Sequence, residues 1–132
     1  ANEYGVGVHG GGKISAGGSS TVTVQGTGGA GAGAANHGVF VVDASSQITS
    51  GGGDIQITGT PGSGTSQFAV YVASSGSVTT SVNGGSITLI GDTMNLTSTV
   101  SANSSSSVTL RQKVNTVAIN GKHAGVIGCR TR

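Results

Sequence analysis

An internal repeat is the sequence feature that most constrains what this chain can fold into. Three segments align, beginning at Tyr4, His37 and Phe68, and their starts are separated by 33 and 31 residues. A period of about 20–50 residues is typical of solenoids and related arrays, in which each repeat buries its apolar side only against its neighbours. The repeat therefore takes priority over any short motif in predicting the fold.

Each repeat contains three short runs in which Val or Ile alternates with polar residues. This two-residue spacing is that of side chains on one side of a β-strand, and no apolar stripe with helical spacing occurs. Gly, Ser, Asn and Asp fill the segments between the runs, as turns require. We expect the apolar residues of equivalent runs to form interior columns, made of Val6, Val8, Ile14, Val22, Val24, Val39, Val41, Ile48, Ile55, Ile57, Val70, Val72, Val78, Ile87, Leu89, Val108 and Leu110.

Three strands in each repeat of about 32 residues predict an all-β chain that folds as a three-sided parallel β-helix, or β-solenoid. We expect roughly three to four coils, each rising about 4.8 Å, in one domain over residues 1–132. The repeats span about 4–35, 36–66 and 67–100, followed by an irregular C-terminal coil or cap over 101–132. A β-propeller or sandwich is the alternative, but propeller blades usually have four strands and aromatic signatures.

The C-terminal part departs from the period. The segments 93–100, 107–114 and 116–121 still resemble strands, but Val108 follows Ile87 by only 21 residues. Either one run is missing there or the coil is smaller. The last ten residues show no clear pattern, and both a cap and disorder are compatible with their sequence.

The stretch GVGVHGGGK at residues 5–13 contains G-x-G-x-x-G and nearly matches a phosphate-binding P-loop. A phosphate loop needs a following helix, whose N-terminus binds the anion. Here another strand-like run follows, and Ile14 stands where the P-loop needs Ser or Thr. The equivalent segments of the other repeats lack both the glycines and Lys13. We therefore predict a strand followed by a glycine turn, with no nucleotide site.

Metal and catalytic chemistry find little support in the composition, because only 8% of the residues are charged. The single cysteine, Cys129, excludes an internal disulfide and any metal site built from several cysteines. His9 and His37 occupy different places in their repeats, so we expect surface histidines without a metal. Asp43 and Asp54 form the best available carboxylate pair for glycoside hydrolysis. We expect no enzyme activity, no metal and no cofactor.

Charge is distributed unevenly along the chain. Residues 1–110 contain four acids and one lysine, a net charge of −3, whereas residues 111–132 contain five basic residues and no acid, a net charge of +5. The basic segment lacks the interleaved aromatic residues that stack on nucleic-acid bases, so we expect no nucleic-acid partner. We instead expect end-to-end contacts through Arg111, Lys113, Lys122, Arg130 and Arg132.

The lateral faces of such a helix would carry many Thr and Ser residues. Regular outward Thr columns can order water, as in ice-binding proteins, and polar faces can contact carbohydrate. Thr is also common on ordinary strands because it is β-branched. The outward residues predicted for the third run are Thr23, Gln56 and Thr88, so this column is uneven.

The segments Asn36–Val41, Ile48–Gly53 and Ile55–Thr60, with Ser107–Gln112 further on, resemble the filamentous-haemagglutinin-like β-strand-repeat adhesins of bacteria. The resemblance covers nearly all of residues 2–114. It implies a right-handed β-helix stalk that is exported, extracellular or bound to the cell surface, and not catalytic. Family members contain many more repeats, and the chain starts abruptly at Ala1 in the middle of the repeat pattern, which favours a fragment or a processed product.

A short β-helix leaves an open β-edge at each end, and such edges recruit other strands. Head-to-tail contact between unlike ends does not close, so it produces a filament. The sequence therefore predicts a structural module of an adhesin-like protein that associates end to end. The alternatives are a module whose lateral faces bind carbohydrate or ice, and a degenerate polysaccharide-active β-helix. We expect no segment that spans a membrane.

Overall fold

The computed structural model describes residues 1–81, 83–114 and 120–123, and within them every regular element is a β-strand. The strands are β1 (Val6–Val8), β2 (Lys13–Ala16), β3 (Val22–Thr27), β4 (Val39–Val41), β5 (Gln47–Ser50), β6 (Ile55–Thr60), β7 (Val70–Val72), β8 (Ser77–Thr80), β9 (Ile87–Ile90), β10 (Thr93–Leu96), β11 (Thr99–Ser101), β12 (Val108–Arg111) and β13 (Asn120–His123). These residues form no helix, and therefore none that could span a lipid bilayer.

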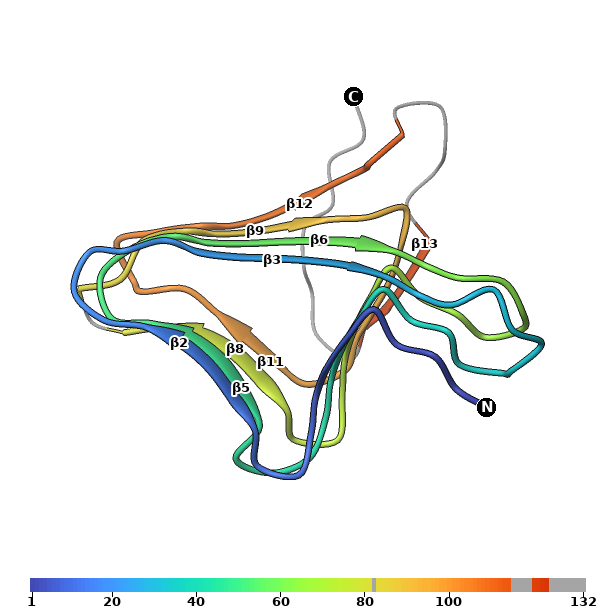
Figure 1. Ribbon diagram of the computed structural model, residues 1–132. Coiled ribbons are helices and arrows are strands. Elements are labelled where there is room, and N and C mark those ends of the chain that lie inside the picture. Colours follow the sequence, from blue (N-terminus) through green and yellow to red (C-terminus); the bar gives the residue numbers. More distant parts are fainter. Residues whose placement is uncertain (82, 115–119, 124–132) are drawn as a thin grey trace.

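The strands form three parallel sheets that enclose the core (Figure 1). Sheet A has the order β1-β4-β7-β10-β13, sheet B has β11-β8-β5-β2, and sheet C has β12-β9-β6-β3. The chain passes from A to B to C and then returns to A one strand further along. The fold is therefore the predicted three-sided parallel β-helix, with about four coils.

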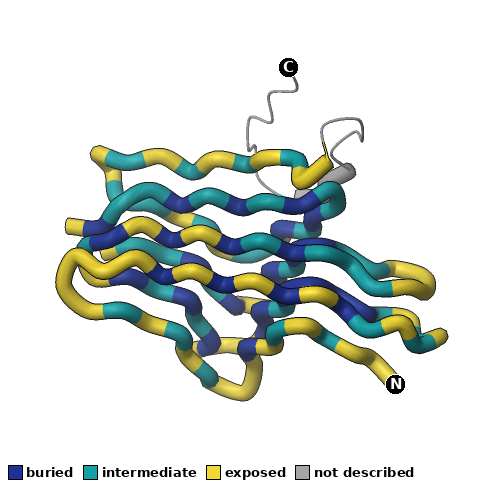
Figure 2. The backbone as a smooth tube through the Cα atoms, turned by 45° about the horizontal axis from the view of Figure 1, so that its top comes forward, coloured by how far each residue is buried: buried dark blue, intermediate teal, exposed yellow. Residues whose placement is uncertain are grey.

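The register of the sheets aligns equivalent residues of successive repeats. Val6 pairs with Val39, which pairs with Val70, and Ile14 pairs with Ile48, which pairs with Val78. Alternate residues of each strand point inward, and the polar residues between them point outward (Figure 2). Parallel strands with a buried inner side favour Val and Ile, because branched side chains pack well on a pleated surface.

All the residues expected in interior columns belong to the core or pack directly against it. Those of the two middle coils are fully buried, as Ile48, Ile57 and Val78 illustrate with 0% exposure. The half-buried members lie in the terminal coils, where no further coil covers them, and they are Val6, Ile14, Val108 and Leu110.

The corner between sheets C and A is built on inward-facing glycines. Gly26 and Gly59 are paired in register in β3 and β6, and both are buried. A Cβ atom on Gly59 would lie 1.9 Å from the backbone oxygen of Ala69. The chain therefore returns so closely against the end of sheet C that no side chain fits at these positions.

The fourth coil begins earlier than expected because the third coil is smaller. The sequence predicts a third repeat that extends to about residue 100, but β10 pairs with β7, so the fourth coil starts at Thr93. The connection from sheet C to sheet A spans residues 28–38 and 61–69 in the first two coils and only 91–92 in the third. No run is missing, because the third coil has all three strands and only its connection to the next coil is shorter.

The two longer connections are joined by the side chain of Asn36, which is fully buried. Its Nδ2 donates to the backbone oxygens of Gly31 (2.7 Å) and Ser63 (2.6 Å). Its Oδ1 accepts a hydrogen bond from the backbone N–H of Glu3 at 2.9 Å. One amide thus joins the N-terminal segment to the connections of the first two coils.

Candidate functional site: the open ends of the β-helix

The glycine stretch at residues 5–13 is the turn between β1 and β2. Gly10 and Gly11 have φ values of 60° and 84°, a left-handed conformation that suits glycine. Their N–H groups donate to the Asp43 carboxylate (3.0 Å) and to the Ser46 hydroxyl (3.0 Å) of the next coil. The N–H groups that a phosphate would need therefore already bind side chains of the protein.

The aspartate carboxylates likewise accept hydrogen bonds from backbone N–H groups of neighbouring coils. Asp43 and Asp54 lie before and after β5, so they are at opposite ends of that strand. The Asp54 carboxylate accepts a hydrogen bond from the backbone N–H of Ser86 (2.8 Å), and the Asp92 carboxylate accepts from Lys113 N–H (2.9 Å). Within the described residues, no group of three or more His, Cys, Asp or Glu side chains could hold a metal ion.

The first coil forms an open edge, because β1, β2 and β3 are the terminal strands of their sheets within the described residues. In sheet B, Gln47 N–H binds the Gly12 carbonyl and Gly51 N–H binds the Ala16 carbonyl. Successive residues of a strand direct their backbone groups alternately to the two sides. The backbone groups of Lys13 and Ser15 therefore point away from the second coil and are available to another strand.

The opposite end is stepped rather than flat. In the part of the chain that the structure describes, sheets B and C end at β11 and β12, whereas sheet A continues for one more strand, β13. The inward residues at this end, Val100, Val108 and Leu110, are only half-buried although they pack against the core. Among the described residues, each end therefore combines strand edges that pair with no further strand and partly exposed apolar side chains.

The basic residues expected to make end-to-end contacts are only partly placed. Arg111 ends β12 and is exposed, and the Lys113 ammonium donates a hydrogen bond to the Thr60 hydroxyl. Lys122 lies in β13, and its backbone is paired with Asn95. Arg130 and Arg132 lie outside the described residues, as does Cys129.

The first coil is neutral in net charge, although residues 1–110 together carry −3. The first coil carries Glu3 and Lys13, which balance each other, and the aspartates lie further along the helix. Their carboxylates bind backbone N–H groups of neighbouring coils, as described above for Asp43 and Asp54. Within the described residues, the two ends therefore offer backbone pairing and apolar contact to a partner.

An aromatic stack on the outer side of sheet A was not anticipated from the sequence. Tyr4 stacks on Phe40 with ring centroids 4.1 Å apart, and His37 stacks on Tyr71 at 4.6 Å. Phe68 completes the group, so every aromatic residue of the chain belongs to it. The signal was present in the repeat, because Tyr4, His37 and Phe68 occupy the same repeat position.

The prediction of a surface histidine is wrong for His37, which is 3% exposed inside this stack. Phe40 and Tyr71 lie on sheet A beside it, and burial lowers the pKa of its imidazole below the ordinary value. Its Nδ1 accepts a hydrogen bond from the backbone N–H of Phe68 at 3.0 Å. The neutral ring thus helps to hold the entry to the third coil. His9 is exposed, as expected.

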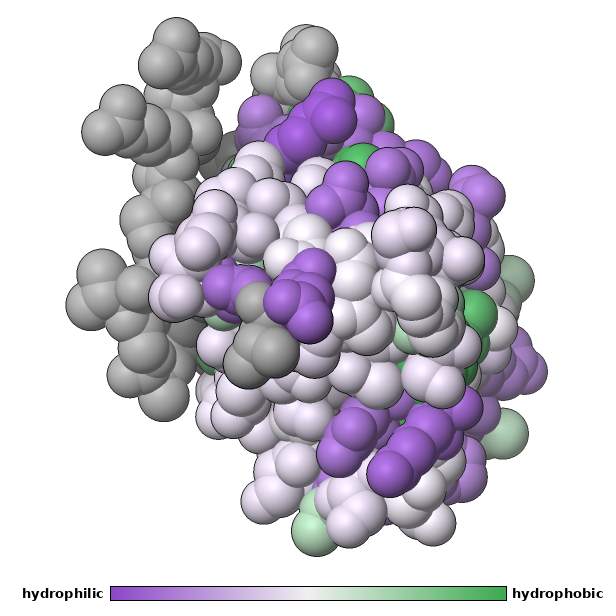
Figure 3. Space-filling model, turned by 90° about the vertical axis from the view of Figure 1, so that its left-hand side faces the viewer, coloured by the Kyte–Doolittle hydropathy of each residue, from purple (hydrophilic) through white to green (hydrophobic). Residues whose placement is uncertain are grey.

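The lateral faces carry the predicted hydroxyl groups, most regularly on sheet B. Ser15, Thr49, Thr79 and Ser101 are paired in register along all four strands of that sheet and alternate with the core residues. In sheet C the corresponding column is interrupted, because Gln56 stands between Thr23 and Thr88. The side where sheets B and C meet is mostly near-neutral in hydropathy, with scattered hydrophilic residues (Figure 3).

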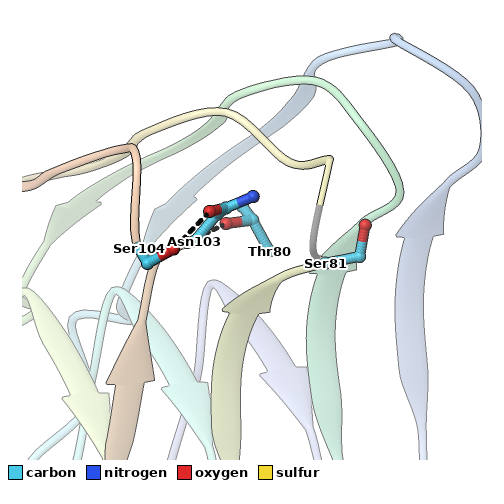
Figure 4. Close-up of a pocket in the computed structure, with 4 residues that line it drawn as sticks. All are labelled: Thr80, Ser81, Asn103 and Ser104. Atoms are coloured by element: carbon cyan, nitrogen blue, oxygen red, sulfur yellow. Dashed lines mark hydrogen bonds between the residues drawn. The ribbon is translucent and has the colours of Figure 1, made fainter.

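A shallow hollow of about 200 Å³ lies at the turns of this side, lined by Thr80, Ser81, Asn103 and Ser104 (Figure 4). The Thr80 hydroxyl accepts from Asn103 N–H (3.0 Å) and donates to the Gly85 carbonyl (3.0 Å). The Ser104 hydroxyl donates to the Asn103 side chain at 3.2 Å. These polar groups bind one another across the turns, which is a structural role.

Comparisons with models of protein families, with curated proteins and with solved structures found no match to this chain.

Proposed function

We propose that this chain is a non-catalytic structural β-helix module that associates end to end into a filament. The observation that supports this proposal is the open first coil, whose three strands are all edge strands in the described residues. Its half-buried Ile14 continues the column of Ile48, Val78 and Val100. The last member of that column, Val100, is half-buried at the other end.

A second copy of the chain fits these ends because each repeat already pairs with the next in one register. If β2 of a second copy paired with β11 as β5 pairs with β8, Ile14 would meet Val100. If β3 paired with β12 in the same way, Val22 would meet Val108. Such contact buries apolar side chains and satisfies edge backbone groups at once, which are the two main gains of forming a coil.

The adhesin-like identity follows from the sequence resemblance, and with it the bacterial, extracellular or cell-surface location. In that setting the module would extend a stalk by stacking coils, and its lateral faces would remain free. A stalk needs length and stiffness, and a β-helix supplies both because every coil is hydrogen-bonded to the next along the axis.

The direct test is electron microscopy of the purified chain at low and high salt. We expect fibres one β-helix wide, with a repeat near 4.8 Å along the axis. The variant Ser15→Pro removes an edge N–H without touching the pairing with β5, and proline on an edge obstructs an incoming strand. We expect it to raise the concentration needed for fibres at least about tenfold.

The matched control is Ser15→Ala, which removes the same hydroxyl but keeps the N–H group. It should form fibres like the original chain, and circular dichroism should show that both variants are folded. Monomers at every salt and protein concentration would refute end-to-end association. Fibres formed equally well by Ser15→Pro would show that the edge of β2 is not the contact.

The second candidate is a module that binds carbohydrate or ice through a lateral face. It is supported by the continuous hydroxyl column of sheet B, formed by Ser15, Thr49, Thr79 and Ser101. A glycan array and an ice-recrystallisation assay test it, with Thr49→Val/Thr79→Val as the variant. Loss of binding in that variant, with fibre formation unchanged, would favour this function.

A further inference from the structure

The interfaces between successive coils all use the same three pairings. The first and second coils are joined by β1–β4, β2–β5 and β3–β6, and the next two interfaces repeat the arrangement. A second copy that continues the helix in register must therefore pair its β1 with β10, its β2 with β11 and its β3 with β12. This requirement follows from the coil geometry, because the three strands of a coil rise together around the axis.

Two of these three places are open within the described residues, and one is taken. β11 and β12 end their sheets, but β10 is paired along its outer side with β13. Neighbouring strands lie about 4.8 Å apart in the pairing direction, so one edge holds only one strand. β13 thus occupies the place that β1 of an incoming copy would need.

β13 is also a poorer continuation of sheet A than β1 would be. It pairs Gly121 with Met94 and His123 with Leu96. By the register of β7 and β10, the incoming strand would place Val6 and Val8 at those same positions. An incoming Val6 would extend the column of Val39, Val70 and Met94 with a further apolar residue, at the register position that Gly121 holds in β13.

We propose that β13 is a displaceable plug that limits end-to-end growth, and this inference rests on the proposed function of filament formation. While β13 is paired with β10, a second copy can engage only two sides of the helix. When β13 is displaced or removed, all three sides are presented together. While it stays paired with β10, β13 therefore raises the protein concentration at which stacking begins.

A reversible lock on β13 tests this in the full-length chain. Asn95 and Lys122 are directly paired in register, and directly paired strand residues lie within the separation that a disulfide can bridge. The variant Asn95→Cys/Lys122→Cys, with Cys129→Ser to prevent mispairing, locks β13 when oxidised and releases it when reduced. We expect the critical concentration for fibres to be at least about tenfold higher in the oxidised form.

The matched control is Thr79→Cys/Ser101→Cys, again with Cys129→Ser, which joins the paired strands β8 and β11. Its disulfide lies within the four coils and away from β13, so oxidation should not change assembly. A second variant, Lys122→Gln/Arg130→Gln/Arg132→Gln, removes positive charge but keeps the strand. It should assemble at the same concentration as the original chain.

The outcomes separate the plug from the filament itself. If fibres form equally well in the oxidised and the reduced form of the locked variant, β13 is not a plug, but end-to-end association is still supported. Absence of fibres in both states of both disulfide variants would refute the proposed function. Faster assembly of the charge variant, with no effect of the lock, would assign the control of growth to charge repulsion and overturn the role of β13.

Discussion

Replacement of Asn36 offers a sharp test of how the first two coils are held together. Asn36→Ala removes three hydrogen bonds, two to the carbonyls of Gly31 and Ser63 and one from Glu3 N–H. A buried hydrogen bond contributes about 1 kcal/mol net, and unpaired buried partners cost more. We therefore expect the free energy of unfolding to fall by roughly 3 kcal/mol, which corresponds to a melting temperature lower by about 10 °C.

Asn36→Asp separates the two halves of this network. The carboxylate can still accept from Glu3 N–H, but its second oxygen faces the Gly31 and Ser63 carbonyls in place of a donor. Repulsion between these oxygens and burial of the charge should make this variant less stable than Asn36→Ala at neutral pH. The difference in stability between Asn36→Asp and Asn36→Ala should become smaller in acid, because a protonated carboxyl group can donate one hydrogen bond.

Urea unfolding followed by far-ultraviolet circular dichroism measures these changes, and the exposed Asn83→Ala is the control, with an expected change within about 0.5 kcal/mol. Hydrogen exchange should show faster exchange in the connections 28–38 and 61–69 of Asn36→Ala. Two results would refute the assigned role of the buried amide. One is a decrease in the free energy of unfolding of Asn36→Ala below about 1 kcal/mol, and the other is an Asn36→Asp variant as stable as Asn36→Ala.

Three further changes test other parts of the fold. The pKa of His37 is lowered in the folded state, so its contribution to stability is complete above the unfolded value of 6.5 and declines as the pH falls below it. Urea unfolding measured against pH should show this decline. The variant His37→Asn keeps an acceptor for Phe68 N–H, and in it the part of the decline that is due to His37 should be absent. Gly59→Ala should cost about 1–3 kcal/mol by thermal unfolding, since its Cβ would collide with the Ala69 carbonyl; unchanged stability would contradict the close approach at this corner. Tyr4→Ala should cost about 1–2 kcal/mol and reduce the near-ultraviolet circular dichroism signal, because it removes a ring stacked on Phe40; an unaltered spectrum would show that the stack is not ordered in solution.

The strand edges at the two ends of the helix decide whether the chain assembles. A β-helix with unpaired edges is stable as a monomer only if its edges are obstructed, and Lys13 on β2 is one such obstruction on the first coil. The plug proposed for the other end acts on sheet A alone. Assembly is therefore expected to depend on the state of a few backbone positions, and only weakly on the overall charge.

The columns of the core were predictable because they depend on local patterning and on the repeat. A two-residue alternation places Val39 and Val41 on one side of a strand, and a spacing of 31 residues to Val70 and Val72 aligns them in the next coil. The glycine turn at residues 5–13 was also predictable, since its counterparts in the other repeats lack the phosphate-binding pattern. The predicted parallel pairing follows from these two periodicities alone.

The sequence by itself therefore determined the three-sided helix and the side of each strand that faces the core. Only the tertiary structure decided the burial of His37, the threefold role of Asn36 and the pairing of β13 with β10. These features depend on contacts between residues of different coils, and connections of different length set which residues meet. Local periodicity specifies the direction of a side chain, whereas its partners depend on how closely the returning chain packs.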